Sequence, residues 1–226
     1  MRMLLALVLS ASMAAQSPGP APATLPAVAT TKLAESLKAA GILKTNHLWR
    51  DVPPMVNGLV NAYIEIPAGE RNKYEFDMRR NALGLDRVIP ESIGGYPVNY
   101  GFVPQTISYD GDPFDVLVLG PPRRPGEVVP GRIVGLMLME DEKGLDSKVV
   151  VTPVGIDGKS MHRLAAADQE RIAAFFRIYK KDDPAAWSKV PGWGTARDGL
   201  SHVTTTHQFF LECRQVAGRP CVIARR

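Results

Sequence analysis

Hydrophobic and polar positions alternate with a period of two from Val60 onward, which is the pattern of half-buried β-strands. One face of the segment 60–66 carries aliphatic side chains, and the other carries Asn61, Tyr63 and Glu65. Proline at position 67 ends this strand. Glycine, proline and aspartate separate the further strand candidates, namely 73–77, Leu83–Ile89, Phe114–Leu119, Arg132–Met139 and Lys148–Val154.

The hydrophobic period becomes helical in the last third of the chain. The segment Asp168–Lys181 predicts an amphipathic helix, and a second, weaker helix is expected from Thr195 to about Arg214. A short helix is also expected over Lys32–Ala40, where Gly41 would end it. Strands followed by helices favour an α+β fold, in which the short strands form a small barrel. The apolar stripe of the first of these helices consists of Ile172, Phe175, Phe176 and Tyr179.

The first 15 residues have the layout of a secretory signal peptide, with Arg2 before an apolar stretch and a small-residue segment after it. We therefore expect a periplasmic or secreted protein; the alternative is an uncleaved leader on a cytoplasmic protein. No later segment has the roughly 20 apolar residues of a membrane-spanning helix, so no membrane association is expected after cleavage. The expected parts are a signal peptide (1–15), a Pro/Ala-rich tether with a short helix (16–55), a barrel domain (56–212) and a C-terminal extension (213–226).

Composition narrows the classes of function. With 226 residues, 45% of them hydrophobic and 22% charged, the chain predicts one folded domain and excludes wholesale disorder. A net charge of +4 is too small to indicate nucleic-acid binding without a concentrated basic patch. Two cysteines cannot form a four-cysteine zinc site, so a metal would need oxygen ligands. In an oxidising compartment the two, Cys213 and Cys221, could pair, and the alternative is two free thiols.

The densest chemistry lies in the segment Asp110–Asp115, which has three carboxylates in six residues just before an apolar strand. Crowded carboxylates repel one another and raise each other's pKa unless hard divalent ions hold them ionised. An EF-hand is excluded, because its fifth and twelfth positions would be Phe114 and Pro121. A solvated acidic turn remains the alternative, since Gly111 and Pro113 favour turns.

A second acidic cluster, 141–148, lies between two predicted strands and by itself indicates a hairpin loop. Several acids occur at strand ends or on polar strand faces, so one barrel mouth could gather them beside basic and tyrosine side chains. Acids that hold metal and bases that hold phosphate are the groups that phosphoryl-transfer chemistry requires. The basic and tyrosine candidates are Lys73, Arg87, Lys148, Lys180, Tyr96, Tyr100 and Tyr179.

These motifs together resemble the family I soluble inorganic pyrophosphatases. The segment 110–116 reproduces the family pattern Asp-x-Asp-Pro-x-Asp followed by an aliphatic residue. The resemblance extends from about Asn61 to Trp193. The other matching segments are Ile64–Pro67, Lys73–Glu75, Asp86–Arg87, Tyr96–Gly101, Asp141–Lys148, Phe175–Phe176 and Tyr179–Lys180.

The resemblance implies a twisted OB-like β-barrel flanked by helices, which hydrolyses pyrophosphate with several Mg²⁺ ions. It also implies a homo-oligomer, in the family a hexamer. Asp112 would be the general base, and Asp115 would bridge two ions. The implied metal ligands are Asp110, Asp115, Asp141 and Asp146, with Glu65 and Glu75 as further or outer ligands.

The same resemblance assigns the contacts with the two phosphates to Lys73, Arg87, Lys148, Tyr100, Tyr179 and Lys180. It also implies that Tyr100 and Arg87 are catalytic, together with Asp112 and Asp115. Tyr96 is a weaker candidate in the surrounding shell. Without the family, Tyr179 would be assigned to the hydrophobic core, the lysines to the solvated surface and Arg87 to a surface ion pair.

Three other functions stay open at this point. One is a broader phosphoanhydride hydrolase that acts on short polyphosphate or nucleotides. Another is an oligonucleotide-binding barrel, which carboxylates at the mouth disfavour because they repel a phosphate backbone. The third is an exported Ca²⁺-binding protein without turnover. Other motifs are weak: Lys159 lies in a hairpin turn rather than a P-loop, and His202 and His207 have structural spacing.

Overall fold

The computed structural model describes residues 47–78, 80–155 and 158–215. The chain divides into two units, Met1–Ile42 and Leu43–Arg226, and the description below concerns only the second. The expected signal peptide, most of the tether, the helix over 32–40 and Cys221 lie outside the described residues. The proposed domain limits and the Cys213–Cys221 pair therefore stay predictions.

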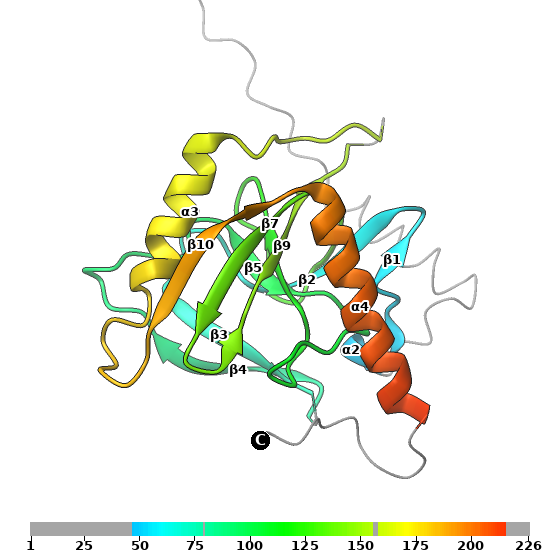
Figure 1. Cartoon of the computed structure of the whole chain (residues 1–226), viewed down its shortest axis with the longest axis horizontal. Helices are drawn as coiled ribbons and strands as arrows, with labels where there is room; N and C mark the ends of the chain where they lie inside the picture. Colours follow the sequence, from blue (N-terminus) through cyan, green and yellow to red (C-terminus); the bar gives the residue numbers. More distant parts are fainter. Residues whose placement is uncertain (1–46, 79, 156–157, 216–226) are drawn as a thin grey trace, which may run out of the picture. The chain divides into compact units, whose positions relative to one another are not determined.

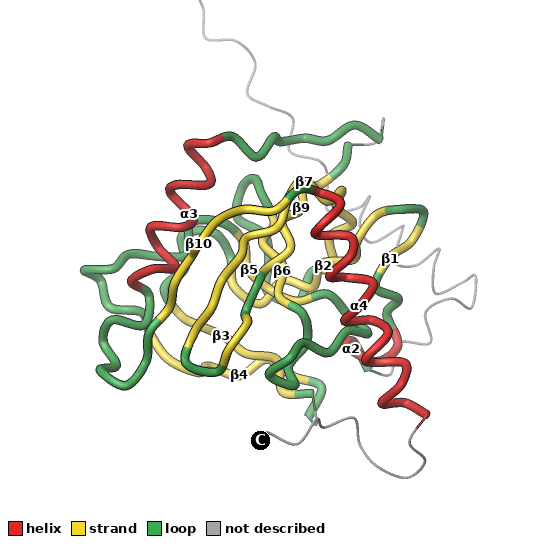
Figure 2. The backbone as a smooth tube through the Cα atoms, viewed as in Figure 1, coloured by secondary structure: helices red, strands yellow, loops and turns green. Residues whose placement is uncertain are grey.

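The core of the second unit is a ring of β-strands. β2 (Leu59–Ile66) pairs with β5 (Asn99–Phe102), which pairs with β6 (Asp115–Val118). β6 pairs in parallel with β9 (Lys148–Pro153), and β9 pairs with the long strand β7 (Val128–Asp141). β7 pairs in turn with β2 and closes the ring (Figure 2). This closure confirms the predicted barrel and the α+β fold class.

Alternation along the ring strands supplies two hydrophobic clusters. In β6, Val116 and Val118 belong to one cluster, whereas Leu117 belongs to the other. In β9, Val150 joins Leu117, and its neighbours Val149 and Val151 join the first cluster. Because successive side chains of a strand point to opposite faces, the segments 116–118 and 149–151 are hydrophobic at every position and buried on both sides.

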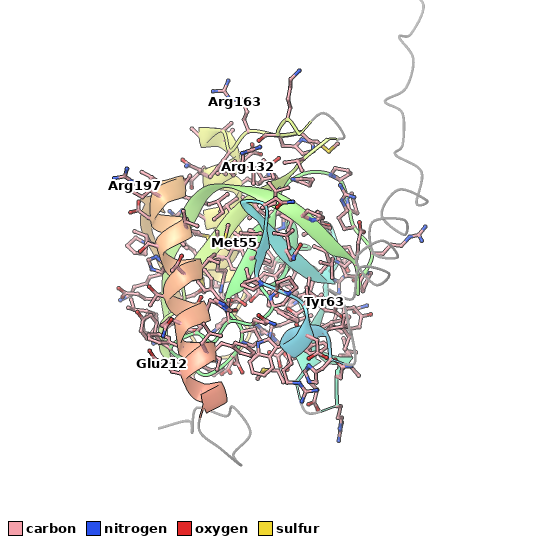
Figure 3. All side chains as sticks on the ribbon, turned by 90° about the vertical axis from the view of Figure 1, so that its right-hand side faces the viewer. Met55, Tyr63, Arg132, Arg163, Arg197 and Glu212 are labelled. Carbon is pink, nitrogen blue, oxygen red and sulfur yellow. The ribbon has the colours of Figure 1, made fainter. Side chains whose placement is uncertain are left out.

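Two helices flank the ring. α3 (Ala166–Ile178) and α4 (Ala196–Gln215) lie on opposite sides of the strands in Figure 1. The predicted apolar stripe of α3 is buried in the cluster that contains Leu117. α4 places Val203 in the other cluster, and Figure 3 views the side on which it runs from Arg197 to Glu212. Both predicted helices are thus confirmed, with ends shifted by one to three residues.

Two short elements precede the ring, α2 (Leu48–Asp51) and β1 (Met55–Val56), and β1 pairs with β2. Trp49 of α2 is buried, and its ring meets that of Phe210 of α4 edge to face at 5.1 Å. The indole Nε1 donates to the Thr106 carbonyl at 2.9 Å. A buried aromatic pair with a satisfied indole fixes this segment against α4.

The hairpin of β3 (Asn72–Asp77) and β4 (Ala82–Val88) forms a separate two-stranded sheet (Figure 1). The sequence predicted a polar outer face for β2, but Asn61, Tyr63 and Glu65 of that face are buried. Glu65 is only 6% exposed, and its carboxylate accepts a hydrogen bond from the Phe76 backbone at 2.8 Å. Tyr63 packs against the rings of Phe76 and Phe102.

The pattern analysis missed the strands β1, β5, β8 (Gly144–Leu145) and β10 (Ser188–Gly194). β5 is four residues long and contains Gly101, where a Cβ atom would lie 1.8 Å from the Tyr63 carbonyl oxygen. β10 contains Pro191, and its register with β7 shifts between Lys189 and Gly192. Gly101 therefore allows close approach of two backbones, and Pro191 accompanies a bulge. A propensity rule assigns both residue types to loops, so it misses these strands.

Weaker sequence assignments are also resolved. Val154 and Ser160 form an isolated antiparallel bridge, which agrees with a hairpin turn at Lys159. The rings of His202 and His207 contact backbone carbonyl oxygens at 2.9 and 2.6 Å, in agreement with structural roles. Within the described residues, no helix is both long and apolar enough to cross a bilayer.

The first turn of α4 has a reciprocal cap whose removal should be measurable. Thr195 Oγ1 accepts from the Asp198 backbone at 3.3 Å, and the Thr195 backbone donates to Asp198 Oδ2 at 2.6 Å. Thr195→Ala should lower the free energy of unfolding by about 1 kcal/mol in urea denaturation. Thr204→Ala is the matched control, because its hydroxyl bonds a carbonyl in mid-helix. Equal effects of the two substitutions would contradict the cap.

The cap should also depend on pH. Hydrogen bonds from Thr195 lower the pKa of Asp198, so its stabilising contribution is complete above the unfolded aspartate pKa of about 3.9. It is lost as the pH falls through the lowered folded pKa. The stability difference between wild type and Thr195→Ala should therefore shrink in denaturation curves measured at progressively more acidic pH.

Candidate active site

Strand ends from across the ring meet at one cavity of about 440 Å³. Because β6 and β9 are parallel with Val116 opposite Val149, their first residues, Asp115 and Lys148, lie side by side. β7 runs antiparallel to β9, so Asp141 at its end lies at the same edge. Twelve predicted site residues line the cavity: Glu65, Lys73, Glu75, Arg87, Tyr100, Asp110, Asp112, Asp115, Asp141, Asp146, Tyr179 and Lys180.

The acidic side chains form one interacting group around Asp115. Burial, and then the charge of Asp115, raises the pKa of both Glu65 and Asp110. Burial also raises the pKa of Asp146 to about 7, although the neighbouring Lys148 opposes the shift. These carboxylates are too close and too poorly solvated to carry full negative charge without cations beside them.

Lys148 supplies one such cation from behind these carboxylates. Its ammonium contacts Asp115 Oδ2 at 2.5 Å and Asp146 Oδ1 at 2.8 Å, and its side chain is 1% exposed. Burial lowers the pKa of Lys148, but the two carboxylates outweigh this effect and raise it overall. Of the residues expected to be metal ligands, general base or phosphate contacts, Lys148 alone does not line the cavity. Its predicted phosphate contact stays a prediction.

Two further lysines each join a pair of acids at the cavity surface. Lys180 Nζ lies 2.7 Å from Asp141 Oδ2 and 2.8 Å from Glu142 Oε1. Lys73 contacts Glu75 and, at 2.8 Å, Asp86 Oδ2. Burial lowers the pKa of Lys73, while its two carboxylates raise it to a net increase.

A tyrosine wall borders the charged groups. Burial raises the pKa of the Tyr100 and Tyr179 hydroxyls far above its usual range, so both remain protonated and can donate hydrogen bonds. The guanidinium of Arg87 lies 5.7 Å from the centre of the Tyr179 ring, and its Nη1 is 3.2 Å from Asp182. Tyr96 is buried, and its ring centre lies 5.4 Å from that of Tyr100.

The donor set matches a hard divalent cation. All the acidic groups offer carboxylate oxygens, the ligands that Mg²⁺ prefers, and their crowding favours bound positive charge. In the described part of the chain, no three acidic, histidine or cysteine side chains already stand in a metal-holding arrangement. Lysine ammonium groups, instead, occupy positions between the carboxylates.

Sequence reasoning did not assign roles to four charged residues that line the cavity. Two of them, Asp86 and Glu142, bind the ammonium groups of Lys73 and Lys180. Asp86 precedes the predicted site residue Arg87, and the pairing of β3 with β4 brings Asp86 close to Lys73. Predicting the register of this hairpin from the sequence would have identified Asp86. The other two are Lys143 and Asp183.

Comparison with known proteins places this geometry in a family. The model of the family described as inorganic pyrophosphatase matches residues 62–211. The inorganic pyrophosphatase of Saccharolobus solfataricus is 39% identical over 151 residues, which is 64% of this chain and 87% of that protein. That of Thermus thermophilus is 43% identical over 153 residues, which is 64% of this chain and 86% of that protein.

Solved structures agree with these matches. The crystal structure of the Thermus thermophilus inorganic pyrophosphatase has a TM-score of 0.66 and 37% identity, covering 73% of this chain and 99% of that one. The Coxiella burnetii inorganic pyrophosphatase has a TM-score of 0.66 and 39% identity, covering 70% of this chain and 99% of that one. The chain therefore belongs to the inorganic pyrophosphatase family.

Proposed function

We propose that the chain hydrolyses inorganic pyrophosphate to two phosphates in this cavity, with Mg²⁺. The observation that carries the proposal is the convergence of carboxylates, lysines, an arginine and tyrosine hydroxyls from separate elements on one cavity of about 440 Å³. Phosphoryl transfer needs positioning of the substrate and neutralisation of charge on phosphate oxygens, and this set of groups offers both.

The acidic wall is proposed to hold the metal ions. Asp110, Asp115, Asp141 and Asp146 are the proposed ligands, with Asp115 shared between two ions. When bound there, Mg²⁺ supplies positive charge for the phosphate oxygens and lowers the pKa of water. The buried Glu65 and the exposed Glu75 complete the wall as further or outer ligands.

Asp112 is proposed to take the proton from the attacking water. It lines the cavity, and its backbone donates to Asp110 Oδ1 at 3.1 Å, which fixes the turn that carries both side chains. A general base must stand within hydrogen-bond reach of the water, beside the groups that position the substrate. Asp112 and the proposed ligand Asp115 lie on either side of Pro113 in sequence, and both line the same cavity.

The basic and tyrosine side chains are proposed to bind the two phosphates. Tyr100 and Arg87 would contact the attacked phosphate, and Lys73, Lys180 and Tyr179 the rest of the substrate. Protonated hydroxyls and cationic groups donate to phosphate oxygens, and such charge-assisted hydrogen bonds are stronger than neutral ones. Lys148 now binds two of the carboxylates and would join these donors as a further phosphate contact.

The remaining proposals rest on the family and on the first residues of the chain. We infer a homo-oligomer, with a hexamer as the family's assembly, and an exported protein whose signal peptide is removed. No nucleic-acid partner is proposed, because the cavity is lined by carboxylates. N-terminal sequencing of the protein recovered outside the cytoplasm tests export, and analytical ultracentrifugation tests the assembly.

Substitution at the acidic wall should abolish turnover without unfolding the protein. Asp112→Asn should lower kcat for phosphate release from pyrophosphate by about 10²–10⁴-fold, the usual contribution of a general base. Asp115→Asn should also inactivate, and it should weaken Mg²⁺ binding as well, because a proposed ligand is lost. Glu91→Gln is the control for loss of a carboxylate, since this side chain is 92% exposed and does not line the cavity. Mg²⁺ binding without phosphate release by the wild type would contradict the enzyme proposal.

A substrate panel separates pyrophosphate hydrolysis from the broader phosphoanhydride activity. Pyrophosphate should be cleaved faster than tripolyphosphate or ATP, because charged groups surround the cavity and leave little apolar wall for a nucleobase. Phosphate release with Mg²⁺ measures all three at equal concentration. Equal kcat/KM values would favour the broader hydrolase.

A further inference from the structure

Three lysines at the site share one arrangement, in which a single ammonium group joins two carboxylates. Lys180 joins Asp141 to Glu142, and the corresponding contacts are at 2.7 and 2.8 Å. Lys148 and Lys73 repeat the arrangement with the pairs Asp115–Asp146 and Glu75–Asp86. Six acidic side chains of the site are therefore neutralised in pairs by the chain's own cations.

These lysines are held in place by burial as well as by charge. The side chain of Lys148 is 1% exposed, and those of Lys180 and Lys73 are 13% and 17% exposed. Lys143 provides a contrast within the same cavity, because its ammonium makes no ion pair with a carboxylate of the described residues. Proximity to an acidic cavity is thus not enough to produce the double contact.

The double contact imposes a competition. Carboxylate oxygens that accept hydrogen bonds from an ammonium group cannot at the same time direct those lone pairs at another cation. An ammonium group whose protons point at two carboxylates likewise has fewer donors for a phosphate. The flexible four-carbon stem of lysine allows the group to turn from one set of acceptors to the other.

We propose that Lys73, Lys148 and Lys180 are exchangeable internal counter-ions, which neutralise the acid pairs of the metal-free site and turn to phosphate once a divalent cation replaces them. This inference rests on the proposed function and adds an order of events, in which the divalent cation displaces the lysines before they bind phosphate. Divalent cation and phosphate then bind cooperatively, because each favours the state in which the lysines have left the carboxylates.

Lys180→Gln gives the sharpest test, because the two roles of the lysine predict opposite changes in two affinities. Titration calorimetry of the full chain with Mg²⁺ alone should show binding tightened by about tenfold, since the ion no longer displaces charge-assisted hydrogen bonds. Inorganic phosphate, titrated into protein saturated with Mg²⁺, should bind at least tenfold more weakly. Lys180→Arg retains the charge and should stay within a few-fold of wild type for Mg²⁺.

Lys143→Gln is the matched control for long-range charge. It removes one cation from the same cavity without releasing a carboxylate pair, so its effect on Mg²⁺ affinity should be several-fold smaller than that of Lys180→Gln. Equal tightening in the two variants would overturn counter-ion exchange, as would unchanged or weaker Mg²⁺ binding in Lys180→Gln. If Lys180→Gln does not fold, Lys73→Gln carries the same paired prediction.

Coupling provides an independent readout. In the wild type, saturating phosphate should tighten Mg²⁺ binding, and saturating Mg²⁺ should tighten phosphate binding by the same factor, as linkage requires. Lys180→Gln should reduce that factor; an unreduced factor would contradict the proposal. These measurements use no turnover, so a failure of pyrophosphate hydrolysis would refute the proposed function while leaving the opposed affinity changes as a separate result.

Discussion

Repulsion among buried carboxylates is the constraint on which this site depends. Asp115 lies at the centre, and its charge acts together with burial on Glu65, Asp110 and Asp146. Without neighbouring cations, these carboxylates would take up protons or move apart, because ionising a carboxylate in a poorly solvated place is unfavourable in free energy. The chain avoids both outcomes by placing cations where the acids are closest.

The barrel makes this placement possible through its strand directions. A ring that contained only antiparallel neighbours would put the starts of adjacent strands at opposite edges. The parallel pair β6–β9 instead brings two strand starts to one edge, and so sets the Asp115 carboxylate against the Lys148 ammonium. The long strand β7 then returns Asp141 to the same edge. One parallel pairing in the ring therefore creates the contact around which the other charges gather.

Much of this could be predicted from the sequence, because period and motif are local properties. The alternation in 60–66 identifies β2, and the helical stripe identifies α3, since each pattern reflects burial of one or more faces. Family-like spacing predicted which residues would line the cavity, although pattern alone left the Asp110–Asp115 segment undecided between a site and a turn.

The rest could not be predicted because it depends on tertiary register. Burial of Glu65 requires the β3–β4 hairpin to pack over β2. The sequence predicts both strands of this hairpin, but no local pattern indicates that they pack on β2. The strand β5 is hidden by Gly101, which a local rule assigns to a loop but which the fold needs for contact with the Tyr63 backbone. The choice of carboxylate partners for each lysine likewise follows from strand pairing.

Tyr179 shows why assignment to core or to site can be a false choice. Helical spacing places it in the apolar stripe of α3, and its ring packs against Phe175 and Phe176 as a core residue would. It also lines the cavity, beneath the guanidinium of Arg87 and near the ammonium of Lys180. The hydrophobic cluster thus fixes the ring, and the fixed ring holds a protonated hydroxyl and a cation-binding face at the cavity. Packing in the core is the physical means by which this wall of the site keeps its geometry while its charged partners exchange.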